Sequence, residues 1–349
     1  MPKIAIIGTT SWGITLGVVL VNKGLQVRLW ARTEPEAAKL KNAGLNPALS
    51  AIIFPTQLSI TSSLGEALAD VETVILAVPS QTMRRNIRLV ADYLNESTLV
   101  VSAAKGLEVG SSKRMSQVIA EEIAPRFWPN ICVLSGPNLS REILSDLPAA
   151  TVVAAENEAI ARVAQKLLST PNLCVYINTD VIGVELGGAL KNIIALGAGM
   201  ADGLSYGDNA KAAFMTRGLT EITALGAALG ANPLTFSGLA GLGDLIATCA
   251  SPLSRNHYVG VELTKGRSLK EITDSMTGMA EGVSTTVAAW NLTRELGIEM
   301  PITEKIYQVL FEGVDPRQAA VELMSAEARH ELVGRKWKLF SLFRHQRHS

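Results

Sequence analysis

The sequence contains few of the residues that build disulfide frameworks or metal sites. Its 349 residues include three cysteines and four histidines, all scattered along the chain. No group of Cys, His and acidic residues has the spacing of metal ligands, so we expect neither a metal site nor a disulfide framework. Neither sign of charge predominates, since 32 basic residues balance 32 acidic ones. This balance gives no indication of a nucleic-acid partner.

Signals for secretion or membrane insertion are also lacking. A strand pattern begins at residue 3 and leaves no room for a signal peptide. The long uncharged stretch 222–243 contains Asn232-Pro233 and several glycines, which is typical of a helix, a turn and a glycine-rich loop rather than a membrane span. No strand leads into a G-x-S-x-G elbow, so a serine hydrolase is not indicated. These features predict a soluble, cytoplasmic, metal-independent globular protein, and the chain length suggests two domains.

Two different patterns divide the chain near residue 180. Before this point short β-branched runs alternate with helical periodicity, which is typical of a doubly wound parallel sheet. After it the strands stop and helical patterns follow. We therefore predict an α/β fold, with an N-terminal Rossmann-like doubly wound sheet over 1–180 followed by an all-helical C-terminal domain over 181–332. The predicted strands are 3–7, 26–30, 73–78, 98–102, 131–134, 150–154 and 173–177. The predicted helices are 11–23, 113–124, 181–200, 209–229, 268–274, 282–296, 303–311 and 316–324.

The last residues, 333–349, form a basic tail that also carries Trp337, Phe340 and Phe343. Chain ends of this kind are commonly disordered, and we expect the same here. The alternative is a short amphipathic segment that makes a weak contact with an anionic membrane surface.

The segment 3–24 has the context of a dinucleotide-binding loop, namely a strand, a tight glycine turn and a helix. Gly8 and Gly13 match the pattern G-x-G-x-x-G, but Thr10 stands at its second glycine. A side chain there is expected to push the phosphates outward or to require a shifted turn. Arg32 follows the second strand, where an acidic residue would favour NAD, and an arginine suits the 2′-phosphate of NADPH. A solvated surface arginine is the alternative, and NADH stays possible.

Lys191 is the one cation in the apolar, helix-like run 181–199. It shares a helical face with Gly187 and Gly188, whose small size would let a flat ligand or another backbone approach closely. A second isolated lysine, Lys105, follows the apolar strand 98–102, where a doubly wound sheet presents functional residues. Together the two lysines indicate a site. The alternatives are a Lys191 that pairs with Glu185 or reaches the surface, and a surface Lys105 beside Glu108.

Five segments, taken in order, resemble the NAD(P)-dependent glycerol-3-phosphate dehydrogenase family in its bacterial form. They are GTTSWG at 8–13, SAAKGLE at 102–108, SGPN at 135–138, GVELGGALKN at 183–192 and GLAGLGDLIATCASPLSRN at 238–256. The resemblance extends from residue 1 to about residue 332, and Thr10 departs from it. It implies reversible hydride transfer between NADPH or NADH and dihydroxyacetone phosphate, which gives sn-glycerol 3-phosphate for glycerophospholipid synthesis.

The resemblance also implies a role for each matching residue. Lys191 becomes the general acid in reduction and the general base in oxidation, a function that ketone reduction requires. Arg255 offers the planar cation that suits a substrate phosphate. The implied substrate-binding residues are Lys105, Gly136, Asn138, Lys191, Asn192, Asp244, Thr248, Ser254, Arg255 and Asn256. The implied cofactor-binding residues are Gly8, Thr10, Ser11, Trp12, Gly13, Arg32, Lys105, Ser140, Arg255 and Glu281.

Several alternatives stay open at the level of the sequence. For Asn138, Asp244 and Glu281, capping of a helix is the alternative to a ligand contact. Asp244 could also hold the Lys191 ammonium. The function could be that of a 6-phosphogluconate or 3-hydroxyacid dehydrogenase of the same architecture, or of a non-catalytic NADPH-binding regulator. The apolar helices of the second half favour a homodimer.

Overall fold

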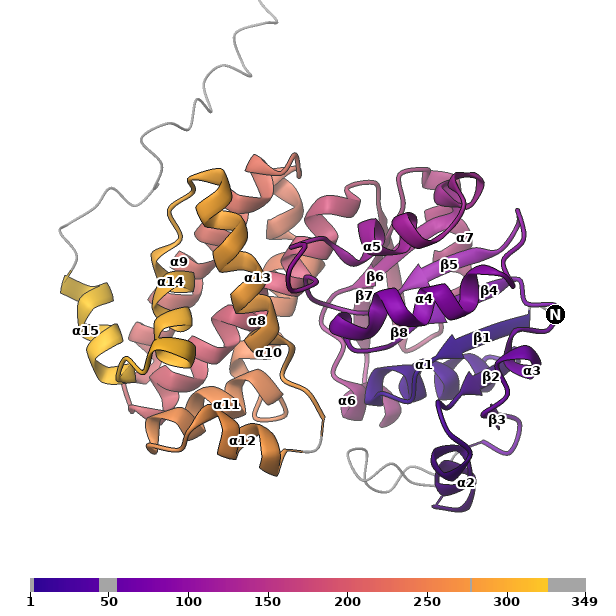
Figure 1. Cartoon of the computed structure of the whole chain (residues 1–349), viewed down its shortest axis with the longest axis horizontal. Coiled ribbons are helices and arrows are strands. Elements are labelled where there is room, and N and C mark those ends of the chain that lie inside the picture. Colours follow the sequence, from indigo (N-terminus) through magenta and orange to yellow (C-terminus); the bar gives the residue numbers. More distant parts are fainter. Residues whose placement is uncertain (1–2, 44–54, 277, 326–349) are drawn as a thin grey trace, which may run out of the picture.

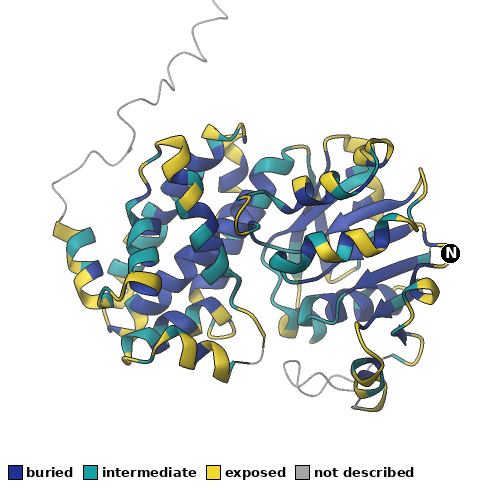
Figure 2. Cartoon of the chain, in the orientation of Figure 1, coloured by how far each residue is buried: buried dark blue, intermediate teal, exposed yellow. Residues whose placement is uncertain are grey.

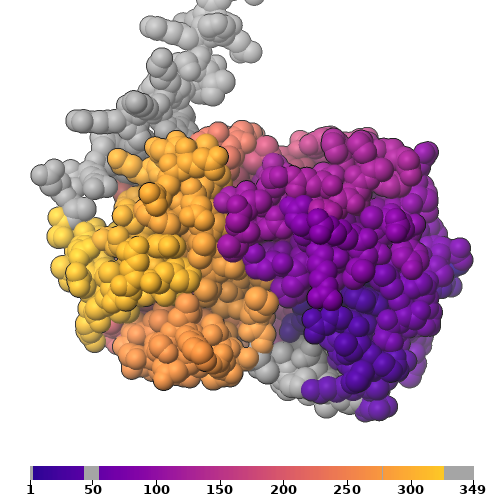
Figure 3. Space-filling model, viewed as in Figure 1, coloured from indigo at the N-terminus to yellow at the C-terminus, as the bar shows by residue number. Residues whose placement is uncertain are grey.

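The computed structural model describes residues 3–43, 55–276 and 278–325 (Figure 1). A part that contains the sheet comes first in the chain, and a helical part follows it. The two parts lie side by side and are in contact along a broad boundary in the space-filling view (Figure 3). The predicted tail 333–349 lies outside the described residues.

Eight strands form one sheet in the order β3-β2-β1-β4-β5-β6-β7-β8. Their bounds are β1 (Lys3–Ile7), β2 (Gln26–Trp30), β3 (Ser59–Thr61), β4 (Thr73–Leu76), β5 (Leu99–Ser102), β6 (Ile131–Ser135), β7 (Ala149–Ala154) and β8 (Leu173–Asn178). All seven predicted strands are present. The sequence pattern misses β3, a three-residue edge strand too short to show a periodicity.

The prediction of a wholly parallel sheet is wrong at one place, the antiparallel pair β6 and β7. Their register sets Ser135 opposite Val152. The segment between them contains one short helix, α6 (Ser140–Leu144), so the chain turns back beside β6 instead of crossing over the sheet. β8 then pairs with β7 in parallel. The sheet is therefore mostly parallel, and the Rossmann-like prediction is otherwise confirmed.

Helices cover both faces of the sheet because successive residues of each buried strand point to opposite sides. In β1, Ile4 and Ile6 belong to the apolar cluster that includes helices α1 and α7. Ala5 and Ile7 belong to the cluster on the other side, with α4 and α5. The strands are accordingly buried between two layers (Figure 2). The helices of this part are α1 (Ser11–Asn22), α2 (Glu34–Ala43), α3 (Leu64–Leu68), α4 (Met83–Ala91), α5 (Met115–Glu122), α6 and α7 (Glu158–Leu168).

The parallel register brings the carboxyl ends of four neighbouring strands to one edge of the sheet. Ile7 lies beside Trp30 and Leu76, and Leu76 lies beside Ser102. The loops that follow these residues carry the glycine turn, Arg32 and Lys105. In a doubly wound sheet this edge is where ligands bind.

The described residues after β8 are helical, as predicted. The elements are α8 (Val181–Gly203), α9 (Gly207–Ala228), η4 (Pro233–Ser237), η5 (Leu239–Gly243), α10 (Asp244–Ala250), α11 (Arg255–Thr264), α12 (Leu269–Ser275), α13 (Glu281–Leu296), α14 (Pro301–Tyr307), η6 (Gln308–Glu312) and α15 (Pro316–Ser325). The stretch 222–243 forms the end of α9, a turn and the short elements η4 and η5. The predicted helix and turn are present, but the predicted glycine-rich loop is wrong, because this segment forms short 3-10 and π-helical turns. The predicted helix 303–311 is divided, because α14 passes into the π-helical turn η6.

α8 is the central helix of this part. It is long and apolar enough to cross a membrane by length and composition, yet 89% of its most apolar window is buried inside the protein. Glycines on both helices allow it to pack closely against α11. A Cβ on Gly260 of α11 would lie 2.0 Å from the Leu196 carbonyl oxygen of α8, and a Cβ on Gly199 of α8 would lie 2.1 Å from the His257 carbonyl oxygen of α11. The two backbones therefore touch directly, which fixes α8 in the core.

Candidate active site

Lys191, Asp244 and Lys105 form a buried row of charges where the two parts of the chain meet. Lys191 Nζ donates to Asp244 Oδ1 at 2.5 Å, and Lys105 Nζ donates to Asp244 Oδ2 at 2.6 Å. The exposed fractions of the side chains are 7% for Lys191, 2% for Asp244 and 17% for Lys105. One carboxylate therefore holds two ammonium groups, and the set has a surplus of positive charge. We call these three residues the lysine–aspartate set.

This arrangement excludes the structural alternatives for the two lysines. Glu185, the alternative partner of Lys191, instead accepts hydrogen bonds from Arg114 and from Ser116. Glu108, the alternative partner of Lys105, is bound by Arg84.

The local structure explains how Asp244 reaches Lys191. Asp244 is the first residue of α10, and its side chain does not cap that helix, so the capping interpretation is wrong. Thr248 lies one turn further along the same face, and its hydroxyl accepts from Lys191 Nζ at 2.5 Å. A Cβ on Gly187 would lie 2.5 Å from the Ala240 carbonyl oxygen. The glycine face of α8 thus admits the backbone of η5, which brings α10 close to Lys191.

The electrostatics of the set lower the pKa of Lys105 to about 8. Burial is the main cause, because it disfavours the charged ammonium, and the neighbouring Lys191 acts in the same direction. Asp244 opposes both effects and raises the pKa. Lys105 is therefore poised to change its charge slightly above neutral pH.

The turn after β6 carries Gly136 and Asn138. Gly136 has a φ of +137°, and a Cβ there would lie 3.0 Å from Thr151 Cα, so the position requires glycine. Its carbonyl oxygen accepts from Lys105 Nζ at 2.7 Å. The Asn138 amide is buried and has no hydrogen-bond partner among the described residues. Asn138 does not cap α6, whose N-cap is Leu139, so that alternative is wrong. An unpaired buried amide beside the lysine–aspartate set indicates a place for a ligand.

Asn192 and Asn256 form a chain of contacts behind Lys191. Asn256 Nδ2 donates to Asn192 Oδ1 at 2.9 Å, while Asn256 Oδ1 accepts from Gly282 N at 2.9 Å. Asn256 therefore ties α8 to the start of α13. Both ends of the Asn256 amide already have protein partners, so a substrate could bind it only by sharing these hydrogen-bonding groups.

Ser254 and Arg255 differ in their surroundings. Ser254 is the N-cap of α11 and accepts from His257 N, so its hydroxyl has a structural partner. The Arg255 side chain makes no hydrogen bond or ion pair with another described residue. Protein atoms surround the guanidinium and lower its pKa, and Glu281 partly offsets this effect. A guanidinium without a bound carboxylate among the described residues is suited to an anionic ligand.

The glycine loop at the end of β1 has a dinucleotide-type geometry. Gly8 has a φ of +109°, and a Cβ there would lie 2.7 Å from the Ala77 carbonyl oxygen. A Cβ on Gly13 would lie 2.4 Å from the Gly8 carbonyl oxygen. Thr10 caps α1: its hydroxyl accepts from Gly13 N at 3.1 Å and donates to Ala77 O at 2.7 Å. The Thr10 side chain is thus turned toward the end of β4 and stabilises the helix start.

The other predicted cofactor residues occupy the same edge of the sheet or the elements beside it. Ser11 and Trp12 begin α1, and Trp12 Nε1 is buried without a partner among the described residues. Ser140 begins α6. Arg32 follows β2 and is exposed. Each of these positions is compatible with a ligand at the carboxyl edge.

Glu281 connects the helical part to the sheet. It is the first residue of α13, but its carboxylate accepts from Ser80 N at 3.1 Å and from the Ser80 hydroxyl. Capping of α13 by this side chain is therefore wrong. Burial raises the pKa of Glu281. Gly106, next to Lys105, packs against this pair, since a Cβ there would lie 2.5 Å from Ser80 Oγ and 3.2 Å from Glu281 Oε2.

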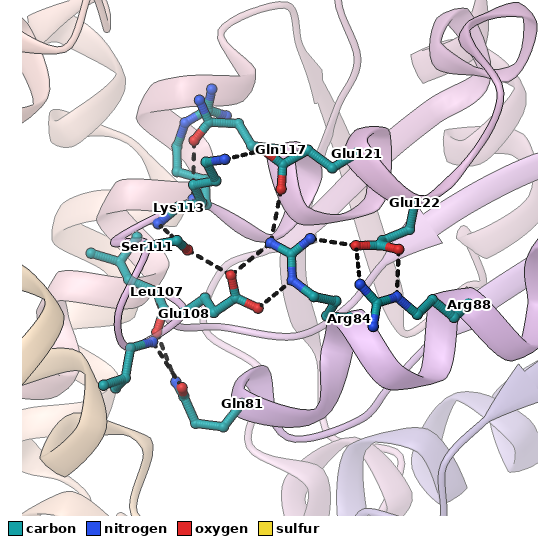
Figure 4. A network of polar contacts seen from close by, with 12 residues as sticks. Gln81, Arg84, Arg88, Leu107, Glu108, Ser111, Lys113, Gln117, Glu121 and Glu122 are labelled. Carbon is teal, nitrogen blue, oxygen red and sulfur yellow. Dashed lines mark hydrogen bonds and ion pairs between the residues drawn. The ribbon is translucent and has the colours of Figure 1, made fainter.

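A polar network that sequence analysis missed holds the loop after Lys105 (Figure 4). Arg84 binds both carboxylate oxygens of Glu108, at 2.9 and 2.7 Å. Gln81 donates to Leu107 O at 2.7 Å and accepts from Val109 N at 2.9 Å. Gln81 lies in the short 3-10 turn Ser80–Thr82 directly before α4, and Arg84 lies in the first turn of α4. Only the fold brings them to the loop. We call this network the loop brace.

The fold and the site together define a class of protein. A glycine loop at the carboxyl edge of a doubly wound sheet, facing a buried lysine held by a carboxylate on the following helices, is the arrangement of two-domain dehydrogenases that use a nicotinamide cofactor.

Comparison with known proteins gives the family within this class. The N-terminal part of the NAD-dependent glycerol-3-phosphate dehydrogenase family matches residues 3–161, and its C-terminal part matches residues 180–321. The chain therefore belongs to the NAD-dependent glycerol-3-phosphate dehydrogenase family, as the sequence motifs predict.

Individual relatives agree with this assignment. A glycerol-3-phosphate dehydrogenase (NAD(P)+) of Dehalococcoides mccartyi is 64% identical over 99% of this chain and 97% of its own length. One from Desulfitobacterium hafniense is 48% identical over 95% of this chain and 94% of its own length. The crystal structure of the Coxiella burnetii glycerol-3-phosphate dehydrogenase superimposes with a TM-score of 0.88 and 36% identity, over 93% of this chain and 99% of that one.

Proposed function

We propose that this protein reduces dihydroxyacetone phosphate reversibly to sn-glycerol 3-phosphate with a nicotinamide cofactor, and so supplies the backbone of glycerophospholipids. Family membership supports the reaction. The observation that carries the proposal within the structure is the lysine–aspartate set, in which Asp244 holds Lys191 at 2.5 Å in a buried site. The dehydrogenases of similar architecture that act on 6-phosphogluconate or 3-hydroxyacids, and a non-catalytic regulator, are not favoured by the comparisons.

The glycine loop fits a dinucleotide. The first turn of a helix has backbone N–H groups without intrahelical partners, and Ser11 and Trp12 are placed to offer such groups to a pyrophosphate. Gly8 and Gly13 allow the strand end, the turn and the helix start to pack closely, because a Cβ on either glycine would meet protein backbone. When bound, the reduced nicotinamide supplies a hydride to C2 of the substrate.

Lys191 is proposed as the proton donor. An ammonium group has three N–H donors, and Lys191 uses two of them on Asp244 and Thr248. The third is left for the carbonyl oxygen of the substrate. There the ammonium stabilises the negative charge that develops as the hydride arrives, and then gives up a proton to form the hydroxyl. In the oxidative direction the neutral amine takes the proton back.

Lys105 is proposed to hold the substrate beside Lys191. Two of its N–H donors contact Gly136 O and Asp244, so one is left here also. Asn138 adds a buried amide with no other partner among the described residues. These groups would fix the substrate carbonyl in one orientation. This lowers the entropic cost of reaching the transition state for hydride transfer.

Arg255 is proposed to bind the substrate phosphate. Its planar guanidinium has no carboxylate partner among the described residues and can form two parallel hydrogen bonds to an oxyanion. Ser254 and Asn256 flank it but already have partners, so their contribution is expected to be smaller.

The experiment that tests the proposal follows the near-ultraviolet absorbance of NADPH or NADH with purified full-length protein and dihydroxyacetone phosphate. We expect turnover that is much faster with the phosphorylated ketone, so dihydroxyacetone itself serves as the control. Equal rates with both ketones, or no turnover with either cofactor despite cofactor binding, would remove the proposal.

Arg32 supports NADPH over NADH. The last strand, β8, ends at Asn178 and α8 begins at Val181, which supports a domain division at about residue 180. A cytoplasmic location and a homodimer also remain proposals, the latter testable by light scattering. A weak membrane contact would reside in the tail 333–349, outside the described residues, and deletion of that tail with liposome sedimentation tests it.

A further inference from the structure

Glu36 places a carboxylate at the carboxyl ends of β1 and β2. It lies in the first turn of α2, and its Oε2 accepts from Arg32 N at 3.1 Å. Its Oε1 accepts from the hydroxyl of Thr9, which belongs to the glycine loop. Since Ile7 and Trp30 are neighbours in the parallel register, Glu36 spans the ends of both strands.

This position matters for the adenosine half of a dinucleotide. In doubly wound nucleotide domains the adenosine ribose lies at the end of the second strand, where a carboxylate accepts the 2′-hydroxyl and disfavours a 2′-phosphate. The residues that directly follow β2 contain no acid, and Arg32 stands there instead. The fold supplies the acid from the next helix, four positions beyond Arg32.

Two opposing charges therefore meet at this place. The Arg32 side chain is exposed and makes no hydrogen bond or ion pair with another described residue, so it is available to a phosphate. Glu36 is half-buried and is held by two donors, so it cannot swing away without losing both contacts. The Thr9 hydroxyl of the glycine loop donates to one of its oxygens and so helps to position the carboxylate.

We propose that Glu36 is a specificity-determining residue that accepts the ribose 2′-hydroxyl of NADH and disfavours the 2′-phosphate of NADPH, in opposition to Arg32. The pair gives an enzyme that uses both cofactors, with Thr9 as the residue that positions Glu36. This inference rests on the proposed nicotinamide-dependent reaction and deepens it at the adenosine end of the cofactor.

A binding experiment tests the inference without turnover. The probes are ADP-ribose and 2′-phospho-ADP-ribose, which differ only in the 2′-phosphate, measured by calorimetry on the full-length protein. Glu36→Gln keeps the shape and removes the charge. We expect it to raise the affinity for the phosphorylated probe relative to the other by about five- to ten-fold, the size of one close charge contact near the surface. Thr9→Val should shift the ratio in the same direction by less.

Glu34→Gln is the matched control, because Glu34 lies in the same helical turn but binds the Ser62 hydroxyl instead of the loop. It should leave the ratio unchanged, and Arg32→Met should shift it the opposite way. A ratio within two-fold of the wild type in Glu36→Gln, an equal shift in Glu34→Gln, or no binding of either probe would overturn the inference.

Kinetics with dihydroxyacetone phosphate separate this inference from the reaction itself. The ratio of kcat/KM for NADPH over NADH should rise in Glu36→Gln with the ratio of probe affinities. If Glu36→Gln shifts the ratio of probe affinities but the wild-type protein does not reduce the ketone, the proposed reaction is contradicted and the inference stands. If the wild-type protein reduces the ketone but Glu36→Gln leaves the NADPH-to-NADH ratio unchanged, the reaction stands and the inference is overturned.

Discussion

Asp244 binds Lys191 at 2.5 Å across 53 positions of the chain, and this contact determines the geometry of the candidate active site. The same carboxylate holds Lys105, which comes from the sheet. Asp244 thus holds a lysine of the helical part beside a lysine of the sheet-containing part. If the proposed reaction holds, activity should depend on all three charges of the set.

Replacing Asp244 with Asn should reduce both stability and turnover. The two ammonium groups would remain buried without their shared countercharge, and loss of one partner of a buried pair typically costs about 3–5 kcal/mol. We expect that decrease in the free energy of unfolding, measured with urea, and a fall in kcat of about a hundred-fold. Asp274→Asn is the control, because Asp274 forms an exposed ion pair with Lys270 and should change stability by less than about 1 kcal/mol. Equal effects of the two variants would contradict the role of Asp244.

The pH dependence of reduction should report the charge of Lys105. Its pKa is lowered to about 8, so the group is protonated below that pH and loses its proton above it. If the charged form holds the substrate, kcat/KM for dihydroxyacetone phosphate falls as the pH rises through about 8. Asp244 raises this pKa, so Asp244→Asn should move the falling limb to lower pH. Lys105→Arg keeps a charge at every accessible pH, and its profile should lack the limb; a limb at the same pH in that variant would exclude Lys105 as its source.

Arg255→Gln should weaken recognition of the substrate phosphate. We expect KM for dihydroxyacetone phosphate to rise by about a hundred-fold, equivalent to about 3 kcal/mol, because a charge-assisted contact is lost. Arg255→Lys should recover only part of this, since an ammonium cannot bind an oxyanion through two parallel hydrogen bonds. The rate with dihydroxyacetone, which has no phosphate, should change little. A similar loss with both ketones would instead indicate damage to the cofactor site or the fold.

Arg84→Met should impair the enzyme through the loop brace. Without Arg84, Glu108 loses the two hydrogen bonds that Arg84 donates to it, and these help to hold the loop after Lys105 (Figure 4). We expect kcat to fall about ten-fold and the limb assigned to Lys105 to move, because small displacements of an aligned group are costly. Arg88→Met is the control: Arg88 lies one turn further on α4, is 62% exposed and binds Glu122 alone among the carboxylates. A pH profile identical to that of the wild type would limit Arg84 to a structural role.

Local sequence patterns predicted much of this molecule because the relevant signals are local. Buried parallel strands such as 3–7 are continuous apolar runs, and the glycine turn at Gly8 follows directly from its strand. The motifs around Lys191 and Asp244 marked residues that the fold then brings together. The strand β7 was predicted, but its antiparallel direction was not, because strand direction depends on the path of the connection, which periodicity does not encode.

The contacts that complete the site depend on the fold as a whole. Glu281 carries a recognisable motif, but nothing in the sequence pairs it with Ser80, 201 positions away. Gln81 and Arg84 lie in an ordinary helix start, and their function appears only beside the Lys105 loop. Glu36 was hidden for the same reason: it lies in the helix after β2, four positions beyond Arg32, and only the fold brings it to the strand ends.

The most direct test of the proposed chemistry compares wild-type protein with Lys191→Met in the reduction of dihydroxyacetone phosphate, monitored by loss of reduced-cofactor absorbance and by formation of sn-glycerol 3-phosphate. Methionine keeps the length and apolar stem of the side chain but has no proton to donate. We predict turnover in the wild type and a fall in kcat of about a thousand-fold in the variant, with cofactor affinity retained. A Lys191→Met variant that reduces the ketone at a rate within a few-fold of the wild type would contradict the central role of Lys191.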